Sequence, residues 1–497
     1  MQYDIVLEKI DETIIKVHCD YGIAAELSDY YKFFVQNARY MKSYKDKLWD
    51  GYIRLFNVKQ SILPTGLFYS CLKWAKDNNY KVKTKNFEPP AKIEKEDIQE
   101  FIDSIFITNE KGKQIHPYEH QFNGVSHALK YKRCILQSPT ASGKSLLIYL
   151  IINYLLANVD KDRKILLVVP TINLVNQMYS DFEDYSQNFE GFIAKDLCHK
   201  ITGGSDKNSD KRVFISTWQS IYKLPRSYFE VFEAVIGDEA HSYKAQEISK
   251  VLEKSVFAQY KIGTTGTTGS KTIDKLQLEA LFGPIKVLTT NEKQMKEGKS
   301  ASLKINILQL KEKDQETCKN VCKLKYAEEI KYLKASEKRF NFIVKLSTKM
   351  KTTSLFLFNG NEFGKRLHKE IQEQNPDKEV YYVDGSIPGN EREKIRKKVM
   401  KKNDSILVCS YQTFSTGVNI KNLNCLVFTT PTKSEIKVLQ SIGRILRIGD
   451  MKNVTLFDIV DDFCYKSSKN YSFKHFLERV KYYNKEKFKY RLKKLVY

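Results

Sequence analysis

The sequence has few of the features that would place a protein in a membrane or an oxidising compartment. None of its 497 residues falls in a run of about 18 apolar residues, so no membrane span is expected. The N-terminus lacks a basic stretch followed by an apolar one, so no signal peptide is expected. Of nine scattered cysteines only Cys318 and Cys322 lie close together, and no second pair completes a zinc site. We expect a reducing cytoplasm.

Acidic residues are also scarce relative to basic ones. Against 59 Asp and Glu stand 83 Lys and Arg, which gives a net charge of +24 and favours a polyanionic partner. A lysine-rich surface that reflects codon use is the alternative. The excess is greatest between residues 464 and 497, where 11 basic and 2 acidic residues alternate with six tyrosines. This segment would either bind phosphates and stack on bases, or form an amphipathic helix that packs on the preceding domain.

A phosphate-binding loop is predicted at Ser138-Pro-Thr-Ala-Ser-Gly-Lys-Ser145. It lacks the first glycine of the pattern G-x-x-x-x-G-K-[ST], but Gly143, Lys144 and Ser145 fit. An apolar strand precedes the loop and an apolar helix follows it, as the motif requires. Backbone N–H groups of such a loop meet phosphate charge, its lysine reaches the β- and γ-phosphates, and its hydroxyl faces Mg²⁺. The ATP-contacting residues predicted here are Pro139, Thr140, Ala141, Ser142, Gly143, Lys144 and Ser145.

A second nucleotide motif is Asp238-Glu-Ala-His241, at the end of the apolar stretch from Phe232. A parallel strand that ends in an acid is typical of a ligand crevice. Asp238, with Ser145, is predicted to hold Mg²⁺, and Glu239 to orient and deprotonate the attacking water. The alternatives are an acid that caps a helix and, for His241, a purely structural role.

With these two motifs the chain resembles superfamily 2 helicases of the DEAH type. The resemblance implies an α/β fold with two RecA-like lobes, each a doubly wound parallel sheet, and ATP and Mg²⁺ as cofactors. It also implies roles for further residues. Tyr118 and Gln121 would read adenine, and Gly417 would contact ATP; Pro170, Thr171, Thr217, Trp218, Ser415 and Thr416 would contact nucleic acid; His241, Thr265 and Thr267 would couple hydrolysis to movement; Gln440, Arg444 and Arg447 would act at the γ-phosphate, the arginines as fingers.

The first 110 residues precede these motifs and read as a small α+β domain. Asp50-Gly51, between apolar alternating residues, predicts a β-hairpin with a two-residue turn. The stretch Trp49-Asp-Gly-Tyr-Ile-Arg-Leu55, followed by Leu63-Pro-Thr-Gly-Leu67, resembles the UvsW family of DNA helicases of T-even-type phages. That resemblance implies a nucleic-acid-binding domain, for which the basic residues Lys42, Lys45, Lys47 and Arg54 are the candidate contacts. Trp49 itself reads as a core aromatic residue.

The expected domains are therefore residues 1–110, lobe 1 at 111–300, lobe 2 at 301–460, and a basic tail at 461–497. The resemblance implies an ATP-driven helicase or translocase that remodels branched DNA by fork regression, branch migration and R-loop unwinding. Its partners would be single-stranded, double-stranded and branched DNA, RNA in R-loops, and a single-stranded-DNA-binding protein; a monomer is expected. The alternatives are an RNA helicase, a catalytically silent junction-binding module, and the motor subunit of a restriction or remodelling complex.

Overall fold

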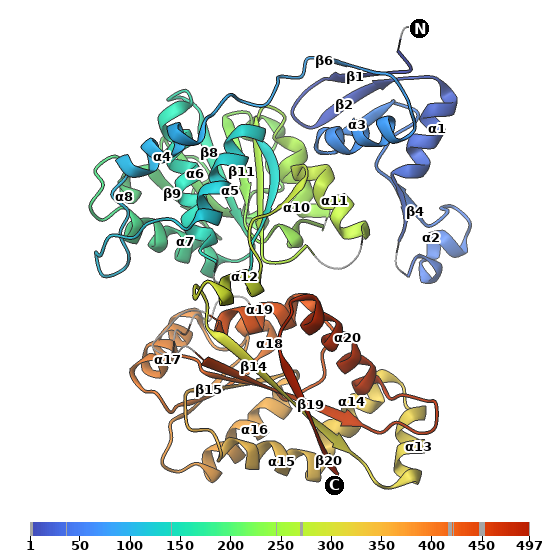
Figure 1. Ribbon diagram of the computed structural model, residues 1–497, viewed down its shortest axis with the longest axis vertical. Helices are drawn as coiled ribbons and strands as arrows, with labels where there is room; N and C mark the ends of the chain where they lie inside the picture. The colour runs from blue at the N-terminus through green and yellow to red at the C-terminus, as the bar shows by residue number, and fades with distance from the viewer. Residues whose placement is uncertain are drawn as a thin grey trace. The chain divides into compact units, whose positions relative to one another are not determined.

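In the computed structural model the chain divides into two compact units (Figure 1). Residues 1–138 and 143–288 belong to the first unit, and residues 139–142 and 289–497 to the second. The structure describes residues 3–35, 37–140, 142–244, 246–268, 272–415, 420, 422–446 and 453–496. Within those ranges no helix combines the length and apolar character that a membrane span requires.

The first unit opens with a small α+β domain. Its strands alternate apolar and polar residues, so one face of each is buried. Helices α1 and α3 contribute Leu27 and Trp74 to the same core. The sheet has the order β5-β2-β1-β6. The elements are β1 (Ile5–Lys9), β2 (Ile14–His18), α1 (Tyr21–Tyr30), β3 (Lys32–Phe34), α2 (Lys42–Lys45), β4 (Tyr52–Arg54), β5 (Ile62–Pro64), α3 (Phe68–Asp77) and β6 (Val82–Lys85), with 3-10 turns η1 (Ala38–Tyr40) and η2 (Thr65–Leu67).

The two-residue hairpin predicted at Asp50-Gly51 is wrong. Strand β4 pairs antiparallel with β3, about twenty residues upstream, and helix α2 lies between them. A two-residue turn of the expected type needs positive φ at both central residues. Gly51 has φ +82°, whereas Asp50 is not among the positive-φ residues. The Asp50 carboxylate instead accepts a hydrogen bond from Tyr52 N (3.0 Å) and pairs with Arg54 (2.6 Å).

Lobe 1 follows as a seven-stranded sheet in which every neighbouring pair is parallel, in the order β13-β7-β12-β11-β8-β10-β9. The central strands β8, β10 and β11 are buried along nearly their whole length, as expected for a sheet covered by helices on both faces. The strands are β7 (Arg133–Gln137), β8 (Lys164–Val169), β9 (Cys198–Ile201), β10 (Val213–Thr217), β11 (Phe232–Gly237), β12 (Tyr260–Thr265) and β13 (Ile285–Val287). The helices are α4 (Lys95–Ser104), α5 (Glu119–Tyr131), α6 (Lys144–Asn158), α7 (Ile172–Tyr185), α8 (Ala194–Leu197), α9 (Trp218–Ile221), α10 (Gln246–Lys254) and α11 (Thr272–Phe282), with η3 (Arg226–Phe229) and η4 (Ala240–Lys244).

The second unit is another seven-stranded parallel sheet, in the order β16-β17-β15-β18-β19-β14-β20. The two sheets confirm the predicted α/β fold with two RecA-like lobes. The strands are β14 (Ser302–Lys311), β15 (Ser354–Phe358), β16 (Val380–Val383), β17 (Ile406–Ser410), β18 (Cys425–Phe428), β19 (Asn453–Asp462) and β20 (Tyr490–Val496). The helices are α12 (Asn291–Lys296), α13 (Gln315–Lys323), α14 (Tyr326–Ala335), α15 (Glu337–Ser347), α16 (Asn361–Gln374), α17 (Gly389–Lys401), α18 (Tyr411–Ser415), α19 (Glu435–Ile445) and α20 (Tyr471–Lys485).

The basic C-terminal segment is part of lobe 2. Helix α20 buries Phe476 and Tyr483 in the lobe's core, which fits the amphipathic-helix interpretation of this segment. Strand β20 then pairs with β14 at the edge of the sheet. Six of its seven residues are exposed.

Two buried ion pairs lie in lobe 2, on the side chains of strand β19. Arg339 donates a hydrogen bond to Asp461 (2.6 Å). Arg479 donates two hydrogen bonds to the Asp458 carboxylate, at 3.0 and 2.7 Å. Each arginine also donates to a main-chain carbonyl after β18, Arg339 to Thr429 and Arg479 to Thr432. These bonds hold the segment that leads into α19.

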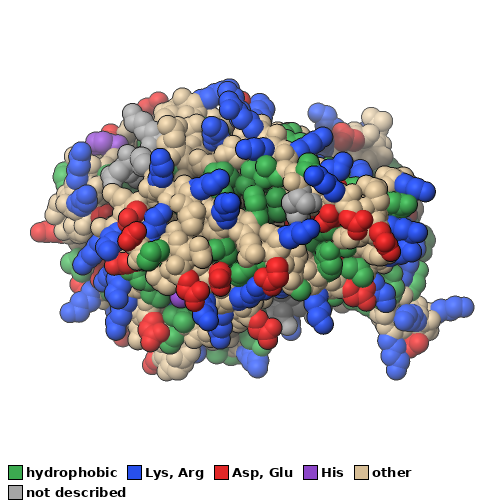
Figure 2. All heavy atoms as spheres, turned by 90° about the horizontal axis from the view of Figure 1, so that it is seen from below, with side chains coloured by type: hydrophobic (Ala, Val, Ile, Leu, Met, Phe, Trp, Pro, Cys, Tyr) green, Lys and Arg blue, Asp and Glu red, His purple; other side chains and the backbone are tan. Residues whose placement is uncertain are grey.

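The excess positive charge is distributed over the surface. Figure 2 shows lysine and arginine side chains across the face in view, with fewer acidic side chains among them. Such a surface attracts polyanions at long range but does not by itself define a site.

The small N-terminal domain is firmly joined to lobe 1. Leu276 and Ala280 of α11 complete its hydrophobic core. A single carbonyl, that of Glu12 in the β1–β2 turn, accepts hydrogen bonds from Arg133 (2.6 Å) and from Lys261 (2.9 Å). Burial, with Arg133 nearby, holds the pKa of Lys261 well below its usual range. These contacts form a seam between the domain and the starts of β7 and β12.

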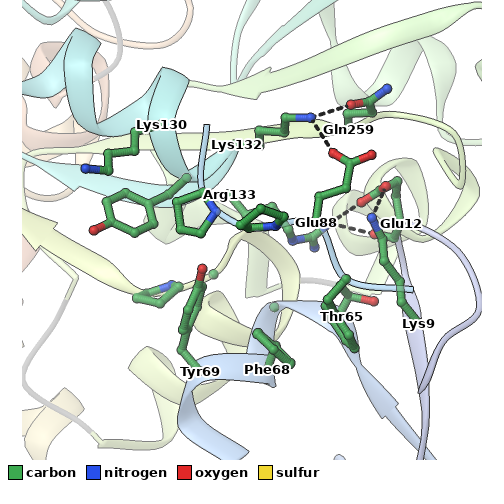
Figure 3. Close-up of a pocket in the computed structure, with 17 residues that line it drawn as sticks. Lys9, Glu12, Thr65, Phe68, Tyr69, Glu88, Lys130, Lys132, Arg133 and Gln259 are labelled. Atoms are coloured by element: carbon green, nitrogen blue, oxygen red, sulfur yellow. Dashed lines mark hydrogen bonds and ion pairs between the residues drawn. The ribbon is translucent and has the colours of Figure 1, made fainter. Parts of the chain in front are cut away.

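A pocket opens beside this seam (Figure 3). Lys132 reaches across it to Glu88 (3.0 Å) and Gln259 (2.8 Å). Phe68 of the small domain stacks on Phe87, with ring centroids 3.9 Å apart. The segment 86–90, which leaves the small domain, is therefore fixed on both sides.

Candidate nucleotide and nucleic-acid site

The predicted phosphate-binding loop lies between β7 and α6. Gly143 caps α6 with φ +77°, in the left-handed region that favours glycine. Lys144 is the first residue of that helix, and its Nζ lies 3.5 Å from the carbonyl oxygen of Ser138. Within the loop, Ser142 N donates to the carbonyl of Pro139 (3.2 Å). The loop thus presents a helix N-terminus and one ammonium, a combination that binds phosphate groups.

Gln121, predicted to read adenine, contacts this loop directly. Its Nε2 donates to the carbonyl of Gly143 (3.0 Å), while its Oε1 accepts from Tyr118 N (2.7 Å). A Cβ at position 143 would lie only 2.3 Å from Gln121 Nε2, so the close approach also requires glycine. Tyr118 is partly exposed and stacks on His120. Gln121 therefore fixes the loop from the side of α5.

Asp238 and Glu239 follow β11, the strand next to β12 in the sheet. Asp238 is buried, and Thr264 donates to its Oδ1 (2.7 Å). Burial raises the pKa of the Asp238 carboxyl to about 6; the Glu239 carboxylate adds to this rise, and Lys144 opposes it. Glu239 has φ +50°, an uncommon conformation for a residue other than glycine and one often found at functional sites.

A chain of contacts runs from Glu239 to the Thr-Gly-Thr segment. His241 Nδ1 lies 3.3 Å from Glu239 Oε2 and 3.1 Å from Thr265 Oγ1. Thr265 Oγ1 in turn donates to the carbonyl of Thr267 (2.8 Å). The carbonyl of Thr265 accepts from Ser138 N (3.0 Å), at the start of the phosphate-binding loop. Close contacts therefore join Glu239 to the predicted coupling residues, and a main-chain hydrogen bond joins Thr265 to the phosphate-binding loop.

The donor set suits a magnesium ion. Asp238 offers a carboxylate, and Ser145 a hydroxyl that lies 2.9 Å from the hydroxyl of Tyr185. No cluster of three or more metal-binding side chains occurs among the residues that the structure describes. Mg²⁺ on nucleotide phosphates needs only one or two protein oxygens, so these two residues fit it. Burial disfavours the charged form of the Asp238 carboxyl, so a bound cation would stabilise it.

The predicted nucleic-acid contacts of lobe 1 lie at the same edge of the sheet, farther along it. Pro170 and Thr171 follow β8, and Thr217 ends β10, the strand paired with β8. Thr171 caps α7 through Leu174 N, and Thr217 Oγ1 lies 2.9 Å from Ser220 Oγ. Trp218 begins α9 and packs on Tyr222. Because β12 and β11 stand between β7 and β8, the phosphate-binding loop lies apart from these residues, whereas Asp238 follows β11, the direct neighbour of β8.

In lobe 2, helix α19 carries two of the predicted catalytic residues. Gln440 is buried, and the Arg444 guanidinium lies 5.4 Å from the centroid of the Phe414 ring. Ser415 ends α18. In the small domain, Arg54 pairs with Asp50, and Lys47 is exposed with φ +55°. Four predicted residues lie outside the described ranges: Ala141, Thr416, Gly417 and Arg447.

Two residues that contact the site were not predicted. Thr264 directly precedes the predicted coupling residue Thr265, and it bonds Asp238. Tyr185, at the end of α7, reaches Ser145 from about 40 residues away, and nothing local in the sequence indicates this.

Comparison with known proteins decides the family. The chain is 31% identical over 509 aligned residues, 99% of each chain, to a protein of Enterobacteria phage T4 described as "ATP-dependent DNA helicase uvsW". The chain belongs to the UvsW helicase family. Matches to three family models agree: DNA helicase UvsW, N-terminal (residues 4–85), type III restriction enzyme, res subunit (residues 91–270), and helicase conserved C-terminal domain (residues 337–449).

Solved structures lead to the same family. The crystal structure of T4 UvsW is 30% identical, covers 99% of both chains and has a TM-score of 0.53. A type ISP restriction-modification enzyme bound to DNA, LlaBIII, shares the fold at 14% identity, over 78% of this chain and 31% of its own, with a TM-score of 0.56. This member of the UvsW family is thus a nucleic-acid-binding, ATP-hydrolysing helicase of superfamily 2.

Proposed function

We propose that this UvsW-family helicase acts on DNA, and on branched DNA in particular, through fork regression, branch migration and unwinding of R-loops. The resemblance to T4 UvsW over nearly the whole chain, N-terminal domain included, supports DNA as the substrate. DNA repair, recombination and replication would use such an activity. We also propose that it works as a monomer in the host cytoplasm, with a single-stranded-DNA-binding protein as a candidate partner.

The observation that carries the catalytic proposal is the set of contacts at the ends of β11 and β12: Thr264 donates to Asp238, and His241 lies between Glu239 and Thr265. Lys144 and the N-terminus of α6 bind the β- and γ-phosphates of ATP, while Gln121 and Tyr118 contact the adenine. Ser145 and Asp238 would hold a Mg²⁺ ion, which would offset the phosphate charge. Glu239 accepts a proton from the attacking water.

His241 contacts both Glu239 and Thr265, so protonation of Glu239 during hydrolysis would alter the contacts of the Thr-Gly-Thr segment. Gln440, Arg444 and Arg447 act on the transferred phosphoryl group, where a guanidinium stabilises the developing charge. Pro170, Thr171, Thr217 and Trp218 of lobe 1, with Ser415 and Thr416 of lobe 2, bind the sugar-phosphate backbone. Such contacts carry no sequence code, so we expect the motor to tolerate any sequence.

Point variants test the catalytic roles. Lys144→Ala should abolish ATP hydrolysis and leave DNA binding intact, because the ammonium contacts phosphates of ATP alone. Glu239→Gln should bind ATP and stall before hydrolysis, since the amide cannot accept the proton. Lys164→Ala is the control, because Lys164 begins β8, at the end of the strand far from the nucleotide motifs. This variant should hydrolyse ATP normally. Turnover by Lys144→Ala would refute the site.

The substrate is tested by the polymer that stimulates ATP hydrolysis. Single-stranded DNA, RNA, a fork, a Holliday junction and an R-loop are compared at equal nucleotide concentration and salt. Greatest stimulation by branched DNA is expected. Greatest stimulation by RNA would make the chain an RNA helicase, the second candidate, for which contacts to the 2′-OH groups would be required.

A further inference from the structure

A small projection, residues 32–35 and 37–54, stands apart from the four-stranded sheet of the N-terminal domain. Strands β3 and β4 form its two-stranded stem, and η1 and α2 its end. Figure 1 shows α2 well away from β1 and β2. Neither strand of the stem joins the larger sheet, so the projection must be held together by its own side chains.

Aromatic rings provide that internal support. The Phe34 ring meets Tyr44 and Tyr52 edge-on, at centroid distances of 5.9 and 5.2 Å. Gly51, at φ +82°, lets Phe34 approach so closely that a Cβ there would lie 2.4 Å from the ring. Trp49 Nε1 donates to the carbonyl of Tyr52 (2.8 Å). These rings form a small core and leave the projection a defined shape.

Other large apolar side chains of the projection face solvent. Tyr40 is 79% exposed, Leu48 81% and Met41 46%. Tyr40 and Met41 precede the single turn of α2, and Leu48 N folds back to bond the carbonyl of Ser43 within that turn (3.0 Å). One turn of helix rises about 6 Å, so the three residues lie at the same end of the projection. Clustered exposed apolar side chains mark a contact surface more often than isolated ones do.

The same end of the projection is basic. Arg39, Lys42, Lys45 and Lys47 are exposed, and none of them forms an ion pair with another described residue. Asp50 is already paired with Arg54, which leaves Asp46 as the acid nearest to the four cations in sequence. Apolar side chains surrounded by unpaired cations suit a nucleic acid, whose bases are apolar faces between rows of phosphates.

We infer that the projection is a wedge for branched DNA. Tyr40 and Leu48 insert beside or between bases where the duplex opens, and Lys42, Lys45 and Lys47 bind the flanking phosphates. This inference rests on the proposed DNA helicase function and assigns one part of it, the separation of bases at the branch point. The phosphate contacts supply affinity for any DNA, whereas the apolar contacts require unpaired or easily unstacked bases and so favour branches.

The test uses the full chain and a DNA fork with 2-aminopurine at the branch point, without ATP. Wild type should raise the fluorescence, because unstacking relieves the quenching of that base. Tyr40→Ala/Leu48→Ala should lose most of this rise and bind the fork roughly 10-fold more weakly, the scale of one lost base contact. Tyr21→Ala, on an 81% exposed tyrosine of α1, is the matched control and should behave as wild type.

A charge variant separates the two kinds of contact. Lys42→Gln/Lys45→Gln/Lys47→Gln should weaken binding to fork and duplex alike, and lower the slope of log Kd against log salt by about 3. The apolar variant should keep the wild-type slope. Circular dichroism checks that both variants fold, as expected for substitutions of exposed side chains.

Two results would overturn the inference in distinguishable ways. If wild type shows fork-stimulated ATP hydrolysis and Tyr40→Ala/Leu48→Ala matches it in fluorescence, affinity and unwinding, the wedge is wrong and the helicase function stands. A surface for a protein partner would give this result. If forks stimulate no ATP hydrolysis by wild type, the proposed function fails and the wedge with it.

Discussion

Arg479 of helix α20 is the side chain whose loss should destabilise lobe 2 most clearly. The Arg479–Asp458 pair is buried, with side chains 1% and 0% exposed. Burial alone would lower the pKa of Arg479, but the Asp458 carboxylate together with Tyr483 and Tyr411 raises it above its usual value. Arg479→Met leaves Asp458 with the hydroxyl of Tyr483 (2.9 Å) and leaves the Thr432 carbonyl without this donor.

The expected cost follows from these contacts. An uncompensated buried charge costs about 3–5 kcal/mol, and a lost hydrogen bond to a carbonyl about 1 kcal/mol. We therefore expect Arg479→Met to lower the free energy of unfolding of lobe 2 by roughly 4 kcal/mol. With a urea dependence of about 2 kcal/mol/M, the midpoint should fall by roughly 2 M. Arg479→Met/Asp458→Leu removes both charges and should be less destabilised than the single variant.

The chain contains its own control for this assay. Its three tryptophans, Trp49, Trp74 and Trp218, all lie in the first unit. Tryptophan fluorescence during urea denaturation therefore follows that unit, whereas hydrogen exchange at β14 and β19 follows lobe 2. Arg479→Met should shift the exchange-detected transition and leave the fluorescence-detected one in place. The reasoning would be refuted if hydrogen exchange showed that Arg479→Met lowers the free energy of unfolding of lobe 2 by less than about 1 kcal/mol. It would also be refuted if the double variant were less stable than the single one.

Two further predictions concern pH and the seam. Burial lowers the pKa of His475 from 6.5 to about 4, so between these pH values the unfolded chain binds a proton that the folded chain does not. The free energy of unfolding of lobe 2 should therefore fall by up to about 3 kcal/mol as pH falls from 6.5 to 4. His475→Phe should remove this part of the pH dependence, as urea titrations across this range would show. A Cβ at Gly66 would lie 2.1 Å from the carbonyl oxygen of Glu279, so Gly66→Val should loosen the seam and expose residues 86–90 to proteolysis. Gly203 has open space around it, so the control Gly203→Val should not increase cleavage. Equal cleavage of the two variants would count against the seam.

Much of the nucleotide site could be predicted because its signals are local. The phosphate-binding loop, the Asp238 strand end and the alternation of strands with helices each lie within a short stretch of sequence, and parallel strands bring their ends to one edge. Two parallel sheets follow from the same alternation, and the structure confirms them.

Contacts between distant segments could not be predicted in this way. The partner of β4 is β3, because aromatic packing around Gly51, not a tight turn at Asp50, decides the pairing. The pairing of Arg479 with Asp458 and the reach of Tyr185 to Ser145 join positions that no short pattern connects. In the tail, the burial of Phe476 and Tyr483 supports the amphipathic-helix interpretation, which the composition alone could not favour.

The seam at Glu12 limits how this chain can be divided. A fragment that began near residue 111 would uncover Leu276 and Ala280 and deprive Arg133 and Lys261 of their shared carbonyl. Residues 1–288 should therefore be inherited and exchanged as one block, in evolution as in the laboratory. Chimaeras of related helicases joined after Leu288 should fold. Chimaeras joined near residue 110 should be less stable, because the small domain and lobe 1 would come from different proteins and their contact surfaces would not fit.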